Sequence, residues 1–273
     1  MKNISKIAAL LAVFLMLFCI TGCGDTAGGT PATPAGGGNS TPTLAEPTMQ
    51  ETPLTLEAVA AGTITLTHPW STLKYKKNGG DFVNVTASAS TIDVAAGDKV
   101  AFYADGSENT SVTALRISCS SDCYVYGNVM SLLSSSDFKN ATSISTEYAF
   151  ARLFYENTHI KNHATKSFVL PAMTLADFCY WVMFDGCTGL TSTPALPATT
   201  LELYCYYEMF KGCSSLNSVT CLATDISAYR CTYEWLDGVA SSGTFTKASS
   251  MSSWPRTVSG IPSGWTVQNY SAQ

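Results

Sequence analysis

The sequence predicts a mixed α/β protein in which a small antiparallel β-sandwich-like domain precedes a short solenoid of repeats. Two observations lead to this fold class. Residues 54–127 alternate between polar and apolar side chains with a period of two, which is typical of half-buried strands. Residues 128–242 contain a repeated pattern whose period lies between 20 and 30 residues, and copies of such a unit stack on one another. A chain of 273 residues has room for both regions.

The chain begins with a predicted secretion signal, residues 1–22. Lys2 and Lys6 precede an apolar run that is too short to span a membrane. The run ends at residues 20–23 in Ile-Thr-Gly-Cys, which resembles the lipobox of bacterial lipoproteins. That resemblance implies that Cys23 becomes the mature N-terminus, carries palmitate or similar acyl chains and anchors an exported protein to a membrane, at the cell surface or outer membrane. The alternative is an ordinary cleaved signal in which Cys23 is incidental.

Residues 23–53 are rich in glycine and proline and poor in large apolar side chains. Such a segment cannot bury a core, so we expect a flexible tether between the lipid and the folded part. The period-two region follows at residues 54–127, with turn-forming glycine and aspartate between its segments. The alternating segments are residues 63–67, 82–85, 91–94, 99–103, 114–117 and 124–126. Short alternating segments at this spacing predict an antiparallel sandwich.

The repeat is clearest where Leu-Pro-Ala at residues 170–172 returns at residues 196–198, a period of 26 residues. Each copy continues as Cys-Tyr-x-x-Met-Phe and closes as Gly-Cys-x-x-Leu. A decayed third copy begins at Leu222, and an earlier one begins near Tyr148. A period of this length is the signature of a leucine-rich-repeat solenoid. The Cys-Tyr-x-x-Met-Phe spacing predicts one short helical turn per copy, closed by Gly186 or Gly212 with positive φ.

The order Leu-Pro, Phe, Gly-Cys-x-x-Leu over residues 144–240 resembles the BspA-like group of bacterial surface leucine-rich-repeat proteins. This resemblance implies a binding role, namely adhesion to host, matrix or neighbouring-cell proteins. The chain departs from the family where Met-Phe, at residues 183–184 and 209–210, replaces the usual Ala-Phe pair. Residues 243–273 are expected to cap the open end of the solenoid, with their tryptophans as packing residues.

Aromatic pairs recur at one place in successive repeats, as Tyr180-Trp181 and Tyr206-Tyr207, followed by Tyr233. The first residue of each pair is expected to pack inward and the second to face solvent. Trp181, Tyr207 and Tyr233 would then form a surface row of the residue types that dominate binding hot spots. They are the candidate ligand-binding residues. In the alternative interpretation the rings only shield the convex side of the solenoid.

Ten cysteines raise the question of metal sites and disulfides. Those of the repeat region fall at matching repeat positions, which favours a buried ladder of small apolar groups. Only Cys119 and Cys123 are close enough in sequence to suggest a zinc ligand pair, and no second pair completes a site. A disulfide between them remains possible in an exported protein. His159 and His163 have helical metal-binding spacing, but no carboxylate completes a zinc-protease motif. We predict no metal and no cofactor.

A net charge of −5 and a charged content of 13% leave no basic patch, which excludes nucleic acid as a partner. No nucleophile elbow, phosphate-binding loop or dinucleotide fingerprint is present, so we predict that the protein is not an enzyme. The leading hypothesis is a monomeric, lipid-anchored binding protein with an extracellular protein or glycan partner. The alternatives are an envelope glycan-binding or glycan-processing protein, which a convergent acidic pair in a cleft would favour, and a purely structural envelope protein.

Overall fold

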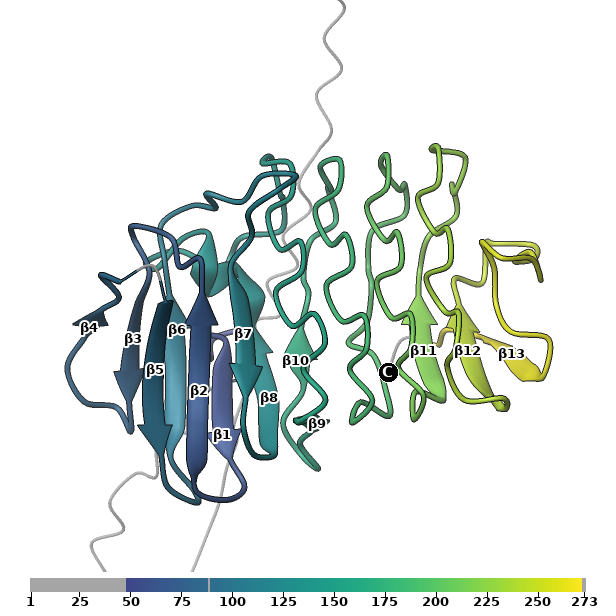
Figure 1. Cartoon of the computed structure of the whole chain (residues 1–273). Helices are drawn as coiled ribbons and strands as arrows, with labels where there is room; N and C mark the ends of the chain where they lie inside the picture. The colour runs from purple at the N-terminus through teal and green to yellow at the C-terminus, as the bar shows by residue number, and fades with distance from the viewer. Residues whose placement is uncertain (1–47, 88, 272–273) are drawn as a thin grey trace, which may run out of the picture. The chain divides into compact units, whose positions relative to one another are not determined.

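A computed structural model describes residues 48–87 and 89–271 of the chain (Figure 1). The predicted signal sequence, Cys23 and the tether up to residue 47 lie outside the described residues. The elements in chain order are β1 (Thr55–Ala58), β2 (Gly62–Thr67), β3 (Lys74–Lys77), β4 (Val83–Asn84), β5 (Ala89–Val94), β6 (Lys99–Tyr103), β7 (Arg116–Cys119), β8 (Cys123–Asn128), the 3-10 helix η1 (Val129–Leu132), β9 (Ile160–Asn162), β10 (Phe168–Val169), β11 (Ser218–Cys221), β12 (Gly243–Lys247) and β13 (Trp265–Asn269).

The predicted mixed α/β class is wrong, because the described part of the chain is built of strands and turns. Strands account for 28% of the described residues and helical residues for 2%, with no α-helix among them. The helical turn expected in each repeat is instead a series of tight turns. The spacing of apolar residues that suggested a helix is equally compatible with these turns. The spacing determines which side chains point inward, but not which conformation the backbone adopts.

Two sheets, one antiparallel and one mixed, form the N-terminal layers. One has the order β5-β2-β7, and the other runs β10-β8-β1-β6-β3-β4, with β9 also paired to β8. Alternate residues of β2 and β6, such as Ile64 and Phe102, are fully buried, which follows from the period of two along a strand. All six alternating segments predicted from the sequence overlap strands of these sheets.

The end of the predicted tether is bound to the sheets rather than free. The Asn128 backbone N–H donates to the Thr52 carbonyl oxygen at 2.8 Å, and the Asn128 side-chain amide donates to the Gln50 carbonyl oxygen at 3.1 Å. Pro53 forms a parallel bridge with Asn128. Residues 50–53 therefore belong to the folded body.

The larger sheet extends into the start of the repeat region. Strands β9 and β10 pair with β8 in parallel, although β8 itself is antiparallel to β1. One hydrophobic core runs through both regions, from Leu56 and Phe102 to Phe184 and Trp235. The sandwich layers thus cover one end of the repeat stack, and the two regions share buried surface.

The repeats stack as coils through what we call the turn ladder, a set of four segments at residues 148–157, 178–187, 204–213 and 230–238. Alternate residues in the first three segments donate their backbone N–H to the next coil, as when Tyr180 donates to the Cys205 carbonyl oxygen at 3.1 Å. Every fourth residue has a left-handed backbone, for example Phe178 (φ 57°), Val182 (φ 57°) and Gly186 (φ 75°). A right-handed helix cannot pass such residues, so each segment becomes consecutive turns. The positive φ predicted for Gly186 and Gly212 is confirmed.

The C-terminal segment adds two strands to the stack, and residues 248–264 between them form an irregular connection. Strands β11, β12 and β13 form a parallel sheet in that order (Figure 1). Trp254 stacks on Trp235 with ring centroids 5.4 Å apart, and the Trp265 indole donates to the Ala240 carbonyl oxygen at 2.7 Å. Both C-terminal tryptophans are buried, so their predicted packing role is confirmed. Within the described ranges, no helix has the length and hydrophobicity needed to cross a membrane.

Candidate functional site

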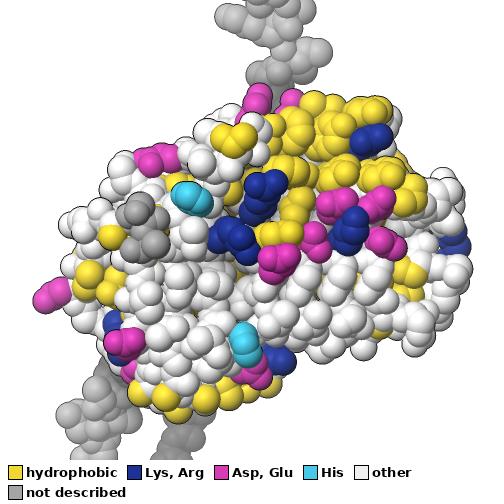
Figure 2. All heavy atoms as spheres, in the orientation of Figure 1, with side chains coloured by type: hydrophobic (Ala, Val, Ile, Leu, Met, Phe, Trp, Pro, Cys, Tyr) yellow, Lys and Arg dark blue, Asp and Glu magenta, His cyan; other side chains and the backbone are white. Residues whose placement is uncertain are grey.

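An aromatic surface, which we call the aromatic stripe, crosses the turn ladder. Its inner row contains the three sequence-predicted residues Trp181, Tyr207 and Tyr233. Its outer row consists of Tyr148, Phe178, Tyr204 and Tyr229. All of these are half-buried except Tyr229, which is 60% exposed. Figure 2 shows apolar side chains gathered over this upper side of the coils, with charged side chains bordering them below.

The partners of the inner-row residues in each pair, Tyr180 and Tyr206, are each 1% exposed and pack into the core. Inward and outward rings therefore alternate along each coil. Sequence reasoning missed the outer row, although Phe178 and Tyr204 recur with the same period of 26 residues and offered a signal of equal strength.

Most ring faces in the stripe are covered by neighbouring side chains. Phe178 lies between Tyr148 and Tyr204, with ring centroids 4.6 and 4.9 Å away and nearly parallel planes. Tyr207 and Tyr233 stack at 5.5 Å. The Arg152 guanidinium covers the ring of Trp181 at 4.4 Å. The stripe consequently presents ring edges and hydroxyl groups rather than open faces, which suits an irregular protein surface better than a flat sugar ring.

A row of charged side chains borders the stripe. Lys211 forms ion pairs with Glu208, at 2.9 Å, and with Glu234. These two carboxylates hold the pKa of Lys211 above its usual range, with the hydrogen bond to Glu234 as the largest cause. All three side chains are partly exposed, so the ion pairs contribute little stability.

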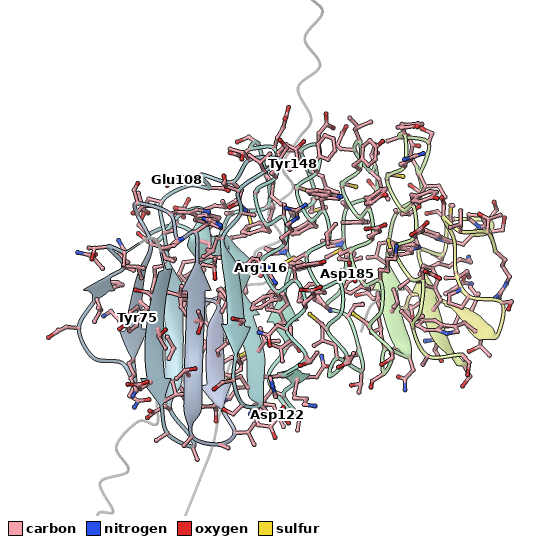
Figure 3. The ribbon with its side chains drawn as sticks, viewed as in Figure 1. Tyr75, Glu108, Arg116, Asp122, Tyr148 and Asp185 are labelled. Carbon is pink, nitrogen blue, oxygen red and sulfur yellow. The ribbon has the colours of Figure 1, made fainter. Side chains whose placement is uncertain are left out.

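A cleft of about 400 Å³ opens between the sheet β5-β2-β7 and the first coils, and we call it the arginine cleft. Arg116 of β7 enters it from the sheet, and Arg152, Trp181, Asp185 and Glu208 enter it from three successive coils. Arg116 and Asp185 lie on the same side of the molecule in Figure 3. Trp181 belongs to both the stripe and the cleft, so the two surfaces adjoin.

The two arginines of the cleft differ in their contacts. The Arg116 guanidinium donates to the Tyr155 carbonyl oxygen at 3.0 Å, lies 4.7 Å over the Tyr155 ring and approaches Glu156 at 3.6 Å. The Arg152 guanidinium contacts the Trp181 ring but has no ion pair or hydrogen bond to any residue in the described ranges. Its donors are therefore available to a ligand.

Burial, reinforced by the nearby carboxylate of Glu208, raises the pKa of Asp185 to about 6. Lys211 opposes this shift and Glu156 adds to it, both as smaller effects. The Asp185 side chain makes no hydrogen bond or ion pair within the described part of the chain, so no direct partner favours its ionised form. The Asp185 carboxyl group therefore titrates nearer to neutral pH than an ordinary aspartate.

The Asp185→Asn substitution is expected to stabilise the protein at pH 7.5 and to have almost no effect at pH 3.5. A carboxyl group whose pKa is raised by folding favours the folded state below its unfolded pKa, and this contribution is lost as the pH rises towards 6. Because the side chain is partly exposed, solvent screening reduces the expected gain to about 1 kcal/mol. Urea denaturation at the two pH values measures it. Asp237→Asn, at the equivalent position two coils later, is the exposed control, and an equal gain in both variants would refute the explanation.

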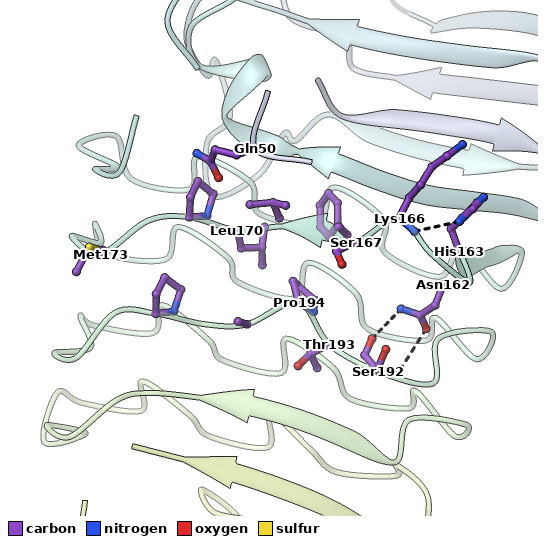
Figure 4. A pocket seen from close by; sticks show the side chains of 15 residues that line it. Gln50, Asn162, His163, Lys166, Ser167, Leu170, Met173, Ser192, Thr193 and Pro194 are labelled. Atoms are coloured by element: carbon purple, nitrogen blue, oxygen red, sulfur yellow. Dashed lines mark hydrogen bonds between the residues drawn. The ribbon is translucent and has the colours of Figure 1, made fainter. Parts of the chain in front are cut away.

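A second groove, of about 490 Å³, lies on another part of the coils (Figure 4). Prolines at residues 171, 194 and 197 line it, and several of its polar groups are already hydrogen-bonded within the protein. The Asn162 side chain donates to the Ser192 carbonyl oxygen at 3.0 Å and accepts from the Thr191 backbone N–H at 2.8 Å. The His163 ring nitrogen accepts from the Lys166 backbone N–H at 3.1 Å. This groove has more volume than the arginine cleft, but the one cationic side chain that lines it within the described residues, Lys166, is already paired with Glu57 at 2.8 Å.

The cysteines of the described residues are all buried free thiols, including Cys119 and Cys123. Within the repeats, the Cys187 thiol donates to the Phe154 carbonyl oxygen at 3.0 Å, and the Cys213 thiol makes the same contact with Phe184 at 3.1 Å. Burial raises the pKa of the Cys187 thiol well above its usual range. These thiols therefore stay protonated and act as small core groups.

The two closely spaced histidines occupy strand ends rather than a helix. His159 pairs with Asp122 at 3.1 Å, and the His163 ring packs edge-on against Tyr124 and Tyr126. In residues 48–87 and 89–271, no group of three or more histidine, cysteine or acidic side chains could hold a metal ion. Compared with known proteins, the chain matches no family model, no curated protein and no solved structure.

Proposed function

We propose that this protein is a lipid-anchored surface protein that binds a protein partner through the aromatic stripe. The observation that carries the proposal is the composition of the stripe, which brings Trp181, five tyrosines and two flanking arginines together on one surface. Tryptophan, tyrosine and arginine are the residue types most enriched in binding hot spots. Each stacked ring is held by its neighbours, so the surface loses little side-chain entropy on binding.

The lipobox at Cys23 supports export and anchoring, and the resemblance to BspA-like surface proteins supports adhesion. The acidic side chains beside the stripe support binding rather than glycan hydrolysis. Glu208 is committed to Lys211, which leaves Asp185 without a second free carboxylate to act as its acid–base partner in the cleft.

The first test is protease shaving of intact cells, with an antibody against residues 54–273 and a periplasmic protein as control. Loss of this protein while the control survives is the expected result. Cleavage only after the envelope has been broken would rule out adhesion at the surface.

The second test measures binding of the full mature chain to immobilised matrix proteins, including fibronectin and laminin. Replacing Tyr207 and Tyr233 together by serine should weaken binding at least about 30-fold, since buried aromatic hot spots contribute 2 kcal/mol or more. Tyr270→Ser is the matched control, because Tyr270 is exposed outside the stripe. Equal binding by the double variant and the control would refute the role of the stripe.

A further inference from the structure

The arginine cleft combines one free cationic group with one free carboxyl group. The Arg152 guanidinium is held in place by the Trp181 ring at 4.4 Å, yet its N–H donors have no acceptor among the described residues. Asp185 faces the same cleft and accepts no hydrogen bond there. The two groups do not form an ion pair with each other within the described ranges, so each can contact a different part of one ligand.

The other charged side chains of the cleft already have partners, which leaves Arg152 and Asp185 as its two free groups among the described residues. Arg116 is occupied by the Tyr155 carbonyl oxygen and by Glu156, and Glu208 is occupied by Lys211. Neither arginine is among the groups that influence the ionisation of Asp185, whereas Lys211, Glu208 and Glu156 are. The cleft thus offers an anion site at Arg152 and an acceptor site at Asp185.

We propose that the arginine cleft binds a carboxylated saccharide, with the sugar carboxylate on Arg152 and sugar hydroxyl groups donating to Asp185. Guanidinium groups bind carboxylates through paired, charge-assisted hydrogen bonds. A volume of about 400 Å³ is in the range of small-molecule sites. This site adjoins the proposed protein-binding surface and shares Trp181 and Arg152 with it, but the proposal does not depend on that function.

Other ligand classes fit less well. A neutral sugar would leave Arg152 without an anion. A cationic ligand would approach two guanidinium groups. An acidic side chain of a protein could pair with Arg152, but it carries no hydroxyl groups for Asp185. A carboxylated sugar presents both kinds of group on one compact ring.

The test titrates the full mature chain with D-glucuronic acid and N-acetylneuraminic acid by saturation-transfer NMR and calorimetry. D-glucose and the methyl ester of glucuronic acid are the neutral controls. Binding of at least one acid, with the neutral analogues at least about tenfold weaker, is the expected result. Equal binding of acid and ester would overturn the proposal, as would no binding of either acid at about 10 mM. Stronger binding of a glutamate-rich peptide that competes with the sugar acid would assign the site to a protein ligand instead.

Substitutions inside and outside the arginine cleft test where the sugar acid binds. Arg152→Gln should weaken acid binding at least about tenfold, and Arg152→Lys, which keeps the charge but loses the paired donors, should weaken it less. Arg230→Gln is the matched control, because Arg230 also lies over aromatic rings, at 4.9 Å from Tyr233, but outside the cleft. Equal affinity of the Arg152→Gln and Arg230→Gln proteins would place the sugar elsewhere. The serine variants of Tyr207 and Tyr233 should bind the sugar acid normally, so failure of one proposal is separable from failure of the other.

Discussion

Replacing Phe184 by alanine should lower the free energy of unfolding by about 4 kcal/mol, because large core side chains typically contribute 3–5 kcal/mol when truncated. Phe184 is 1% exposed and lies in a continuous stack between Phe154, at 5.5 Å, and Phe210, at 5.4 Å. Phe168 adds an edge contact at 5.8 Å. Alanine therefore leaves a cavity in the middle of the coils that both neighbours can fill only by leaving their own positions.

Thermal unfolding measures the effect, and the midpoint should fall by about 12 °C for a folded region of this size. Tyr229→Ala removes an aromatic ring that is 60% exposed and should change the midpoint by less than about 2 °C. Since one hydrophobic core joins the repeats to the sheets, the Phe184→Ala protein should still unfold in a single transition. A loss below about 1 kcal/mol, or a separate early transition for the repeats, would contradict the shared core.

The substitution of Asn109 by alanine should cost about 3–4 kcal/mol. Asn109 is 8% exposed, and its side-chain oxygen accepts from the Trp70 indole at 2.6 Å and from the Leu115 backbone N–H at 2.8 Å. Its amide nitrogen donates to the Tyr148 carbonyl oxygen at 3.1 Å. Alanine would leave these groups buried without partners, at about 1–3 kcal/mol each before relaxation.

Urea denaturation should give the loss directly, with Asn140→Ala as the control, because the Asn140 amide makes an exposed contact with Asp137. Asn109→Asp gives a further test. Its carboxylate keeps the acceptor but places a negative charge against the Tyr148 carbonyl oxygen, so this variant should be less stable at pH 7 than at pH 4. Similar losses for the Asn109 and Asn140 alanine variants would show that the hydrogen bonds of Asn109 contribute no net stability.

The parts of the fold that could be predicted are those in which burial follows a simple period. Alternation identified strand segments such as β2 and β6, whose buried residues occupy every second position. It missed β1, which lies between β6 and β8 and is buried at most positions, and β3, whose lysine-rich sequence has no apolar face. The sequence of β3 lacks the alternation on which the prediction depended, whereas β1 contains it, with Leu56 and Ala58 alternating with Thr55 and Glu57, but over only four residues.

The period of the repeat could be recognised in the sequence, but the backbone conformation of each repeat copy could not. Residues such as Tyr204, Glu208 and Glu234 adopt positive φ, which only glycine signals in a sequence. The bonds between coils compensate for that unfavourable conformation, and they exist only after the coils have stacked. A local pattern therefore indicated a helix where neighbouring coils impose turns.

Only those residues of the candidate site that recur with the repeat could be predicted from the sequence. Equal spacing identified Trp181, Tyr207 and Tyr233, since residues at matching positions lie in one row. The arginine cleft could not be found in this way, because Arg116 comes from β7 and meets Arg152 only through the packing of the sheet on the first coil. The sequence contains no signal for that contact.

The number of stacked coils sets the length of the aromatic stripe. Successive coils hydrogen-bond to one another as strands of a parallel sheet do, so each coil advances the surface by one strand spacing, about 5 Å. An in-frame duplication of one 26-residue copy would add one ring to each row while leaving the sheets at one end and β13 at the other unchanged. The reach of the binding surface could thus be adjusted in equal steps by recombination between copies, without redesign of the core.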